Sequence, residues 1–345
     1  MPERAPAPSR LARAAVAFAI GALAGLGCYL HLRHAGMLAG DFTWPWRAAR
    51  ALLEGQNPYA AIRPSGPFPF DAYFKYPLPA ALVALPVAAL EPHAAGALFF
   101  GVSVTLLAWA LTRDGYSRLL VLASGPLLSA ATMVQWSPLL AAAALLPALG
   151  FVAAAKPNLG LAAVGARPTW RAVGGAAALL LVSLAVLPRW PLDWLSVLRQ
   201  GTEAHYRAPV TLPGGALVLV LLLRWRRPEA RLVLFLACVP QIIAFYDQLL
   251  LLLVPRTRRE SMLAALLSLV AFQGWLARGG LAPAEWTGTT QAWPWIATLL
   301  FAPAVVMILR RPNEGPTPLW AHRCAAWLDA RRMRRRGAQG RAEAE

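Results

Sequence analysis

This sequence has few charged residues. Only 14% of the 345 residues are Asp, Glu, Lys or Arg, and 58% are hydrophobic, whereas a soluble domain carries about 25% charged residues. The hydrophobic residues form blocks of roughly membrane-spanning length, without the period-two alternation that marks a lipid-exposed barrel. Since a backbone in lipid must satisfy its own hydrogen bonds, these blocks are expected to be helices. The composition excludes an ordinary soluble domain and predicts an all-α polytopic membrane protein.

Cysteine and lysine are scarce too. The three cysteines have no paired spacing, so neither a disulfide framework nor a zinc site is predicted. Lysine occurs only at Lys75 and Lys156. A net charge of +17 would suit nucleic-acid binding in a soluble protein, but arginine in membrane proteins collects in cytoplasmic loops and contacts anionic lipids. No nucleic acid is therefore expected as a partner, and the basic tail over 312–345 is expected to bind anionic membrane lipids.

The apolar blocks predict about 10–12 transmembrane helices in a domain that covers 1–311. Arginines precede the first block, 12–31, which predicts a cytoplasmic N-terminus by the positive-inside rule. A second crossing is expected at 77–92, and the resulting count leaves the turn from Arg113 to Arg118 outside, against that rule. Arginine-rich turns near 224–227, 256–259 and 310–311 are expected inside, so that the C-terminus is cytoplasmic as well.

The stretch 32–75 is predicted to be a long extracytoplasmic loop. Within it, 41–55 has the spacing of an amphipathic helix that lies in the membrane interface. The apolar positions on one side of this helix are Trp46, Ala49, Leu52 and Leu53. The charged positions on the other side are Arg47, Arg50 and Glu54.

Ionisable side chains near the membrane are costly, so each is a functional candidate. Asp41, Lys75, Lys156 and Asp247 are predicted to lie near the same extracytoplasmic face, and a second outside segment carries Glu203, His205 and Tyr206. Cations beside carboxylates suit a lipid-linked phosphate substrate, because lysine binds phosphate and a carboxylate can take a proton from a hydroxyl. Structural roles stay open: Asp41 as a helix cap, Lys75 reaching to the interface, and Asp247 as a hydrogen-bond partner between helices.

No nucleotide-binding motif accompanies these residues. The sequence has no GxGxxG run, no Walker loop, no HExxH motif and no Ser, His and Asp in the chain order of a catalytic triad. A sugar donor would therefore be lipid-linked rather than nucleotide-linked. A lone Asp at the start of the loop, without a clustered second carboxylate, does not predict a metal.

Several runs resemble glycosyltransferase family 87, the bacterial polyprenyl-phosphate-mannose-dependent mannosyltransferases and their relatives in the GT-C superfamily. They are Gly40-Asp41-Phe42, the stretch 48–59 (AARALLEGQNPY) and Tyr76-Pro77-Leu78-Pro79, followed by Gln135, Lys156-Pro157 and Tyr246-Asp247.

The resemblance implies a GT-C-like helical bundle in the bacterial cytoplasmic membrane and an inverting transfer of mannose or another hexose. It implies a polyprenyl-phosphate sugar donor, an extracytoplasmic lipid or glycan acceptor, and no cofactor. Asp41 matches the general base. The expected substrate-binding residues are Tyr59, Lys75, Tyr76, Gln135, Lys156, His205, Tyr206 and Asp247.

Two other classes remain open. A transporter or flippase for a lipid-linked or small solute would also place charge near the membrane, although it predicts broken helices in paired halves. A non-catalytic membrane subunit could keep the same scaffold.

Overall fold

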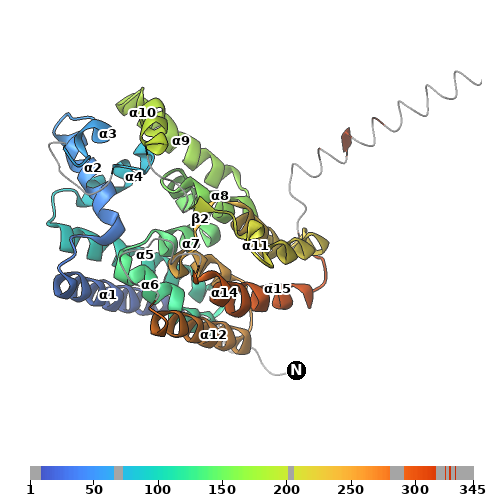
Figure 1. The fold of residues 1–345 in the computed structure, drawn as a ribbon. Helices are drawn as coiled ribbons and strands as arrows, with labels where there is room; N and C mark the ends of the chain where they lie inside the picture. Colours follow the sequence, from blue (N-terminus) through green and yellow to red (C-terminus); the bar gives the residue numbers. More distant parts are fainter. Residues whose placement is uncertain are drawn as a thin grey trace, which may run out of the picture.

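The computed structural model describes residues 9–65, 73–200, 206–279 and 291–315, with four further positions at 323, 326, 327 and 331. In these residues the chain is helical almost throughout (Figure 1). Two short strands, β1 at Tyr206–Arg207 and β2 at Gln241–Ile242, pair antiparallel. The predicted all-α class is confirmed, while most of the predicted basic tail lies outside the described residues.

Among the described residues, three helices are long and apolar enough to cross a membrane. They are α1 at Arg10–Ala35, α5 at Pro92–Leu111 with its 3₁₀ extension η3 at Thr112–Asp114, and α12 at Arg258–Ala277. A fourth candidate is the pair α9, Trp170–Val186, and α10, Trp190–Arg199, which bends by 93°. A helix of the length of α1 spans about 39 Å, enough for a hydrocarbon core of about 30 Å. The chain therefore has the helices of a membrane protein.

The other apolar stretches form shorter helical segments, many of them 3₁₀. The total of 10–12 crossings stays a prediction, because long helices do not account for it. In chain order the remaining segments are η1 Gly40–Phe42, α2 Thr43–Leu53, α3 Pro58–Ala61, α4 Leu78–Ala84, η2 Leu85–Val87, η4 Ser117–Leu122, α6 Gly125–Met133, α7 Ser137–Leu145, η5 Pro147–Ala154, α8 Pro157–Ala166, η6 Pro209–Thr211, η7 Gly215–Arg224, α11 Pro228–Cys238, η8 Phe245–Leu253, α14 Trp293–Ile296, the π-helical η9 Ala297–Phe301 and α15 Ala302–Leu309.

Local sequence signals set the ends of the long helices. The hydroxyl of Ser9 accepts a hydrogen bond from the Ala12 N–H, and α1 ends where Gly36 takes a left-handed conformation with φ of 63°. At the start of α12, Thr257 and Glu260 each bond to the other's backbone N–H. Such caps satisfy donors that a helix end would otherwise leave unpaired.

Helices α1 and α5 pack antiparallel through glycines. A Cβ atom at Gly21 would lie 2.6 Å from the carbonyl oxygen of Gly101, so only glycine permits this approach. At one end of the pair, Arg13 at the start of α1 donates to the Trp109 carbonyl at 3.1 Å, near the end of α5. We call this end the N-terminal face, and the opposite end, where α1 leads into residues 36–76, the loop face. The turn from Arg113 to Arg118 therefore lies on the N-terminal face, and its predicted position on the loop side is wrong.

The wrong position for this turn came from counting 77–92 as a second crossing of the membrane. Its helical part, α4 with η2, has 10 residues and would span about 15 Å. Both its ends contact the loop: the Tyr59 hydroxyl donates to the Tyr76 carbonyl at 3.1 Å, and the Trp46 indole donates to the Leu90 carbonyl at 3.2 Å. The segment thus starts and ends on the loop face, and removing this crossing from the count brings the next arginine-rich turn into accord with the positive-inside rule.

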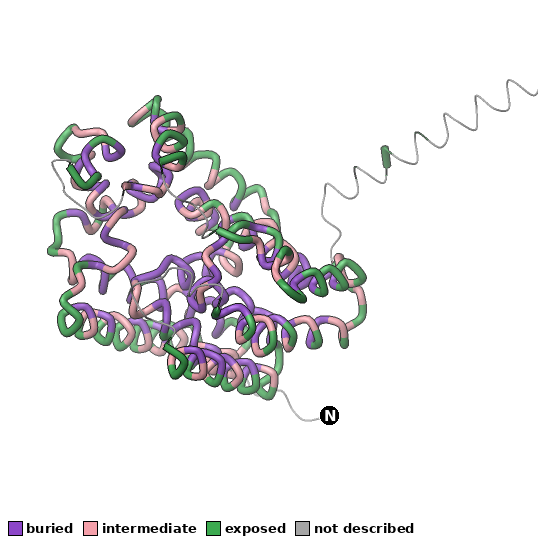
Figure 2. Tube along the Cα trace, viewed as in Figure 1, coloured by how far each residue is buried: buried purple, intermediate pink, exposed green. Residues whose placement is uncertain are grey.

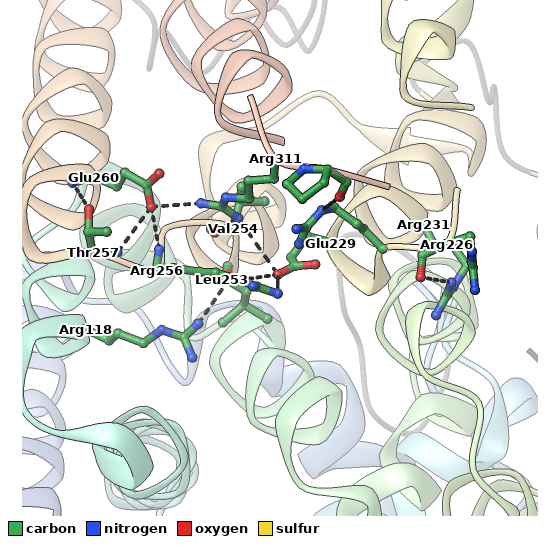
Figure 3. Close-up of polar contacts among 12 residues, drawn as sticks. Arg118, Arg226, Glu229, Arg231, Leu253, Val254, Arg256, Thr257, Glu260 and Arg311 are labelled. Atoms are coloured by element: carbon green, nitrogen blue, oxygen red, sulfur yellow. Dashed lines mark hydrogen bonds and ion pairs between the residues drawn. The ribbon is translucent and has the colours of Figure 1, made fainter. Parts of the chain in front are cut away.

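Arginine side chains bind the carbonyl ends of helices on the N-terminal face (Figure 3). Arg118 donates to the last carbonyl of η8, at Leu253, and Arg231 donates to the last carbonyl of α8, at Ala166, each at 3.0 Å. Arg256 pairs with Glu229, and Arg311 pairs with Glu260 at 2.8 Å. A cation at the C-terminal end of a helix offsets the partial negative charge there. The arginine-rich turns predicted to share one side do lie together.

A small second core holds the loop together, and its buried residues include Ala48, Tyr59, Phe74 and Trp190. Helix α2 corresponds to the predicted amphipathic helix, with Trp46 and Ala49 buried, but Leu53 is 67% exposed and does not belong to its inner face. Helix α10 packs on this loop, because the Asn57 amide donates to Asp193 at 2.9 Å and the Trp194 indole donates to the Lys75 carbonyl at 2.8 Å. The loop is therefore supported by a segment far along the sequence.

The outer faces of the long helices are exposed, whereas the interior is buried (Figure 2). The exposed residues of α1 include Leu11, Phe18, Leu23 and Leu26, with exposed fractions from 55% to 82%, and those of α12 include Met262 and Leu266. Continuous apolar surface of this kind suits contact with lipid.

Candidate functional site

Four polar side chains, predicted separately from the sequence, lie in one row of contacts. Asp41 lies in η1 between α1 and α2, Gln135 between α6 and α7, Lys156 between η5 and α8, and Asp247 in the first turn of η8. Each occupies a break between helical segments or the start of one. We call these four residues the polar row.

Backbone geometry brings the first two members together. Gly40 has φ of 54° and Val134 has φ of 49°, both in the left-handed region. A Cβ atom at Gly40 would lie 2.6 Å from the Met133 carbonyl oxygen. The two breaks thus touch through their backbones, and Asp41 and Gln135 follow directly after the contact.

Hydrogen bonds link the four side chains in order. The Gln135 Nε2 group donates to Asp41 Oδ2. Lys156 Nζ donates to Gln135 Oε1 at 3.2 Å and to Asp247 Oδ1 at 2.9 Å. Because an ammonium group can only donate, Lys156 fixes the orientation of the Gln135 amide and turns its NH₂ group toward Asp41.

The row holds two carboxylates and one ammonium group, and their surroundings differ. Gln135 and Asp247 are buried, with exposed fractions of 0% and 2%, while Asp41 and Lys156 are partly exposed. The protein around Asp41 raises the pKa of that carboxyl to about 6, because desolvation outweighs the opposing effects of Lys156 and Gln135. Asp41 is thus the carboxylate of the row that a substrate can reach and that can take a proton near neutral pH.

Aromatic rings enclose the row. The Trp136 ring is fully buried and lies 5.0 Å from Phe99 and 6.3 Å from Tyr76, centre to centre. The ring of Tyr246 lies 5.5 Å from Lys156 Nζ. Burial, and next the charge of Asp41, raise the pKa of Tyr76 well above its ordinary value, so its hydroxyl stays protonated. These rings lower the local dielectric and strengthen the electrostatic contacts within the row.

The other residues predicted to bind substrate are not members of the polar row. Tyr59 supports the loop through its bond to the Tyr76 carbonyl. Lys75 is partly buried, and its carbonyl accepts a hydrogen bond from the Trp194 indole. Tyr206 lies in β1, opposite Ile242 of β2, and is 42% exposed. His205 lies outside the described residues.

Sequence reasoning missed Trp136 and Ser137. The Ser137 hydroxyl is buried in the first turn of α7 and has no hydrogen-bond partner. The signal was present in the polar run from Gln135 to Ser137, which interrupts a long apolar stretch.

Comparisons with known proteins leave the site to be interpreted from its own residues. No protein-family model matches the chain, nor does any curated protein or solved structure. Among the described residues, no group of three His, Cys, Asp or Glu side chains has the arrangement of a metal site.

Proposed function

We propose that this protein is a membrane glycosyltransferase that moves a sugar, mannose or another hexose, from a polyprenyl-phosphate donor to a hydroxyl of a lipid or glycan acceptor. The observation that carries the proposal is the arrangement of the polar row. A reachable carboxylate with a raised pKa lies one amide group away from a buried ammonium group. Acceptor activation needs the first group and a departing phosphate needs the second.

Asp41 would act as the general base. Its Oδ2 atom accepts from Gln135, and no described hydrogen bond uses Oδ1. The Oδ1 atom would take the proton of the acceptor hydroxyl while the hydroxyl oxygen bonds to the anomeric carbon. Attack from the side opposite the phosphate inverts that carbon.

Lys156 would stabilise the leaving group. As the carbon–oxygen bond to the phosphate breaks, the bonding electrons move to the phosphate oxygen. Two of the three Lys156 donors are used, by Gln135 and Asp247, which leaves one for that oxygen. An ammonium group held in place beforehand stabilises the developing charge without reorganisation.

The test is transfer of labelled sugar from a polyprenyl-phosphate donor by purified protein in lipid. Asp41→Asn keeps the shape and an acceptor oxygen for Gln135 but removes the base, so transfer should fall by about 10²–10⁴. Arg258→Gln, at the exposed start of α12, is the control and should leave transfer unchanged. Wild-type transfer by the Asp41→Asn protein would refute the assignment of the base.

A transporter or flippase is the second candidate, and one observation favours it. The polar row lies at helix breaks, and irregular backbone beside an ion pair is also how transporters form their binding sites. Flux of a lipid-linked sugar into sealed vesicles, with no sugar transfer to any acceptor, would favour this class. The absence of both activities would favour a non-catalytic subunit.

A further inference from the structure

A cavity lies at the loop-face end of α12, and none of its lining residues belongs to the polar row. It has a volume of about 540 Å³ and is formed between α12 and the segment α14–η9, which are neighbours in Figure 1. Its lining residues are Trp275, Arg278, Gln291, Pro294, Trp295 and Thr298. None of them was a candidate from the sequence.

The lining of this cavity combines apolar rings with a few hydrogen-bond donors. Arg278 is the only ionised lining residue, and its guanidinium group lies 5.3 Å from the centre of the Trp295 ring, which holds it over that face. Among the described residues, no carboxylate forms an ion pair with Arg278. The Thr298 hydroxyl is already used, because it donates to the Pro294 carbonyl at 2.6 Å. The described lining of the cavity therefore carries positive charge.

An unpaired donor points to a missing acceptor. Trp275 is 9% exposed, and its indole N–H is buried without any hydrogen-bond partner. Indole can only donate, so a ligand oxygen is what would satisfy it. A buried donor left unpaired costs about 1–3 kcal/mol. An oxyanion beside Arg278 would satisfy both groups.

The position of the cavity selects the kind of anion. Helix α12 is a membrane-spanning candidate that starts at the arginine cluster of the N-terminal face, so its far end lies at the opposite membrane boundary. Exposed apolar side chains such as Leu266 and Val270 lead along α12 toward that end. An occupant with its anion in the cavity would lay an apolar tail along this surface.

We propose that this cavity binds the phosphate group of a lipid, with Arg278 and the Trp275 indole as the donors. The inference does not depend on sugar transfer. The Trp275 ring also lies 5.5 Å from the Phe245 ring, and Phe245 begins η8 two residues before Asp247. Under the proposed function, the cavity would hold a lipid phosphate on the far side of Phe245 from the polar row.

Binding tests this directly, without any turnover. Purified protein in detergent is titrated with a polyprenyl monophosphate, with the same polyprenol lacking phosphate, and with inorganic phosphate, and bound molecules are counted by native mass spectrometry. Trp275→Phe keeps the ring and removes the N–H, and it should weaken binding of the polyprenyl phosphate about tenfold or more, as should Arg278→Gln. Arg258→Gln, at the other end of α12, is the matched control and should bind like wild type.

Each outcome decides the matter. Unchanged affinity in both Trp275→Phe and Arg278→Gln would overturn the proposal and leave these residues as interface anchors. Equal affinity for inorganic phosphate would also overturn it, because the lipid would add nothing. Phosphatidylglycerol is a further arm: if it binds as tightly and with the same dependence on Trp275, the lipid phosphate is that of a membrane phospholipid. The binding measurement involves no sugar transfer, so failure of the glycosyltransferase proposal is distinguishable from failure of this one.

Discussion

The Nζ atom of Lys156 lies 2.9 Å from Oδ1 of Asp247, and these side chains are almost fully enclosed, with exposed fractions of 13% and 2%. A buried pair of this kind gives little net stability, since desolvation offsets the attraction. Removing one partner, however, leaves a buried charge without compensation. Substitution of either partner should therefore have a large effect on the free energy of unfolding.

Lys156→Met and Asp247→Asn should each lower the free energy of unfolding by about 3–5 kcal/mol. The double variant should recover most of that loss, because no uncompensated charge remains. Thermal or chemical unfolding in detergent measures the coupling between the two sites, with Arg258→Gln as an unaffected reference. Simple addition of the two losses would show that the residues are not paired.

Gly40→Ala should displace Asp41 from Gln135, because the new methyl group would lie 2.6 Å from the Met133 carbonyl oxygen. We expect sugar transfer to fall at least tenfold, since catalysis depends on geometry at the scale of about 1 Å. Gly55→Ala is the matched control. Gly55 also has a left-handed backbone, with φ of 70°, but a Cβ there would meet nothing within 4 Å. Equal transfer by the two variants would refute the role of the backbone contact.

Transfer should depend on pH through Asp41. The base works only when deprotonated, so the rate should fall about tenfold per pH unit below a pKa of about 6 and level off above it. Lys156 and Gln135 lower the pKa of Asp41, while Asp247 raises it. Lys156→Met should therefore move the midpoint of the pH profile upward. A midpoint that stays in place would show that Lys156 does not act on the base.

Asp41→Asn should stabilise the protein while it inactivates it. Burial raises the pKa of Asp41 from 3.8 to about 6, so the folded state prefers the protonated carboxyl. The stability that this protonation gives is complete below pH 3.8 and is lost as the pH rises through about 6. Asparagine avoids this loss, so the variant should gain about 3 kcal/mol at pH 7 and nothing at pH 3.5. Unfolding of both proteins at the two pH values measures this difference in the free energy of unfolding.

Part of the site could be predicted because ionisable residues are rare in this sequence. Scarcity alone selected Asp41, Lys156 and Asp247, and all three lie in the polar row. Gln135 followed from the family resemblance, but its place between Asp41 and Lys156 did not, because the contact spans 94 positions in the chain. The left-handed backbone that creates it, at Gly40 and Val134, leaves no periodic signal.

The topology was harder to predict. Hydropathy treats 77–92 as a crossing, because it does not distinguish an apolar segment that stays at one face from one that passes through. That single error placed Arg113 on the wrong side. The support of the loop by α10 was also beyond the sequence, since the bond from Asn57 to Asp193 joins segments 136 positions apart.

The arginines on the N-terminal face have a mechanical consequence. Three of them bind a carbonyl at the end of a helix that belongs to another part of the chain, as Arg118, Arg231 and Arg311 do for Leu253, Ala166 and Val254. One end of the bundle is thereby cross-linked, while the helices are interrupted toward the other end. Relative displacement of the helices should accordingly be smallest at the arginine cluster and larger toward the loop.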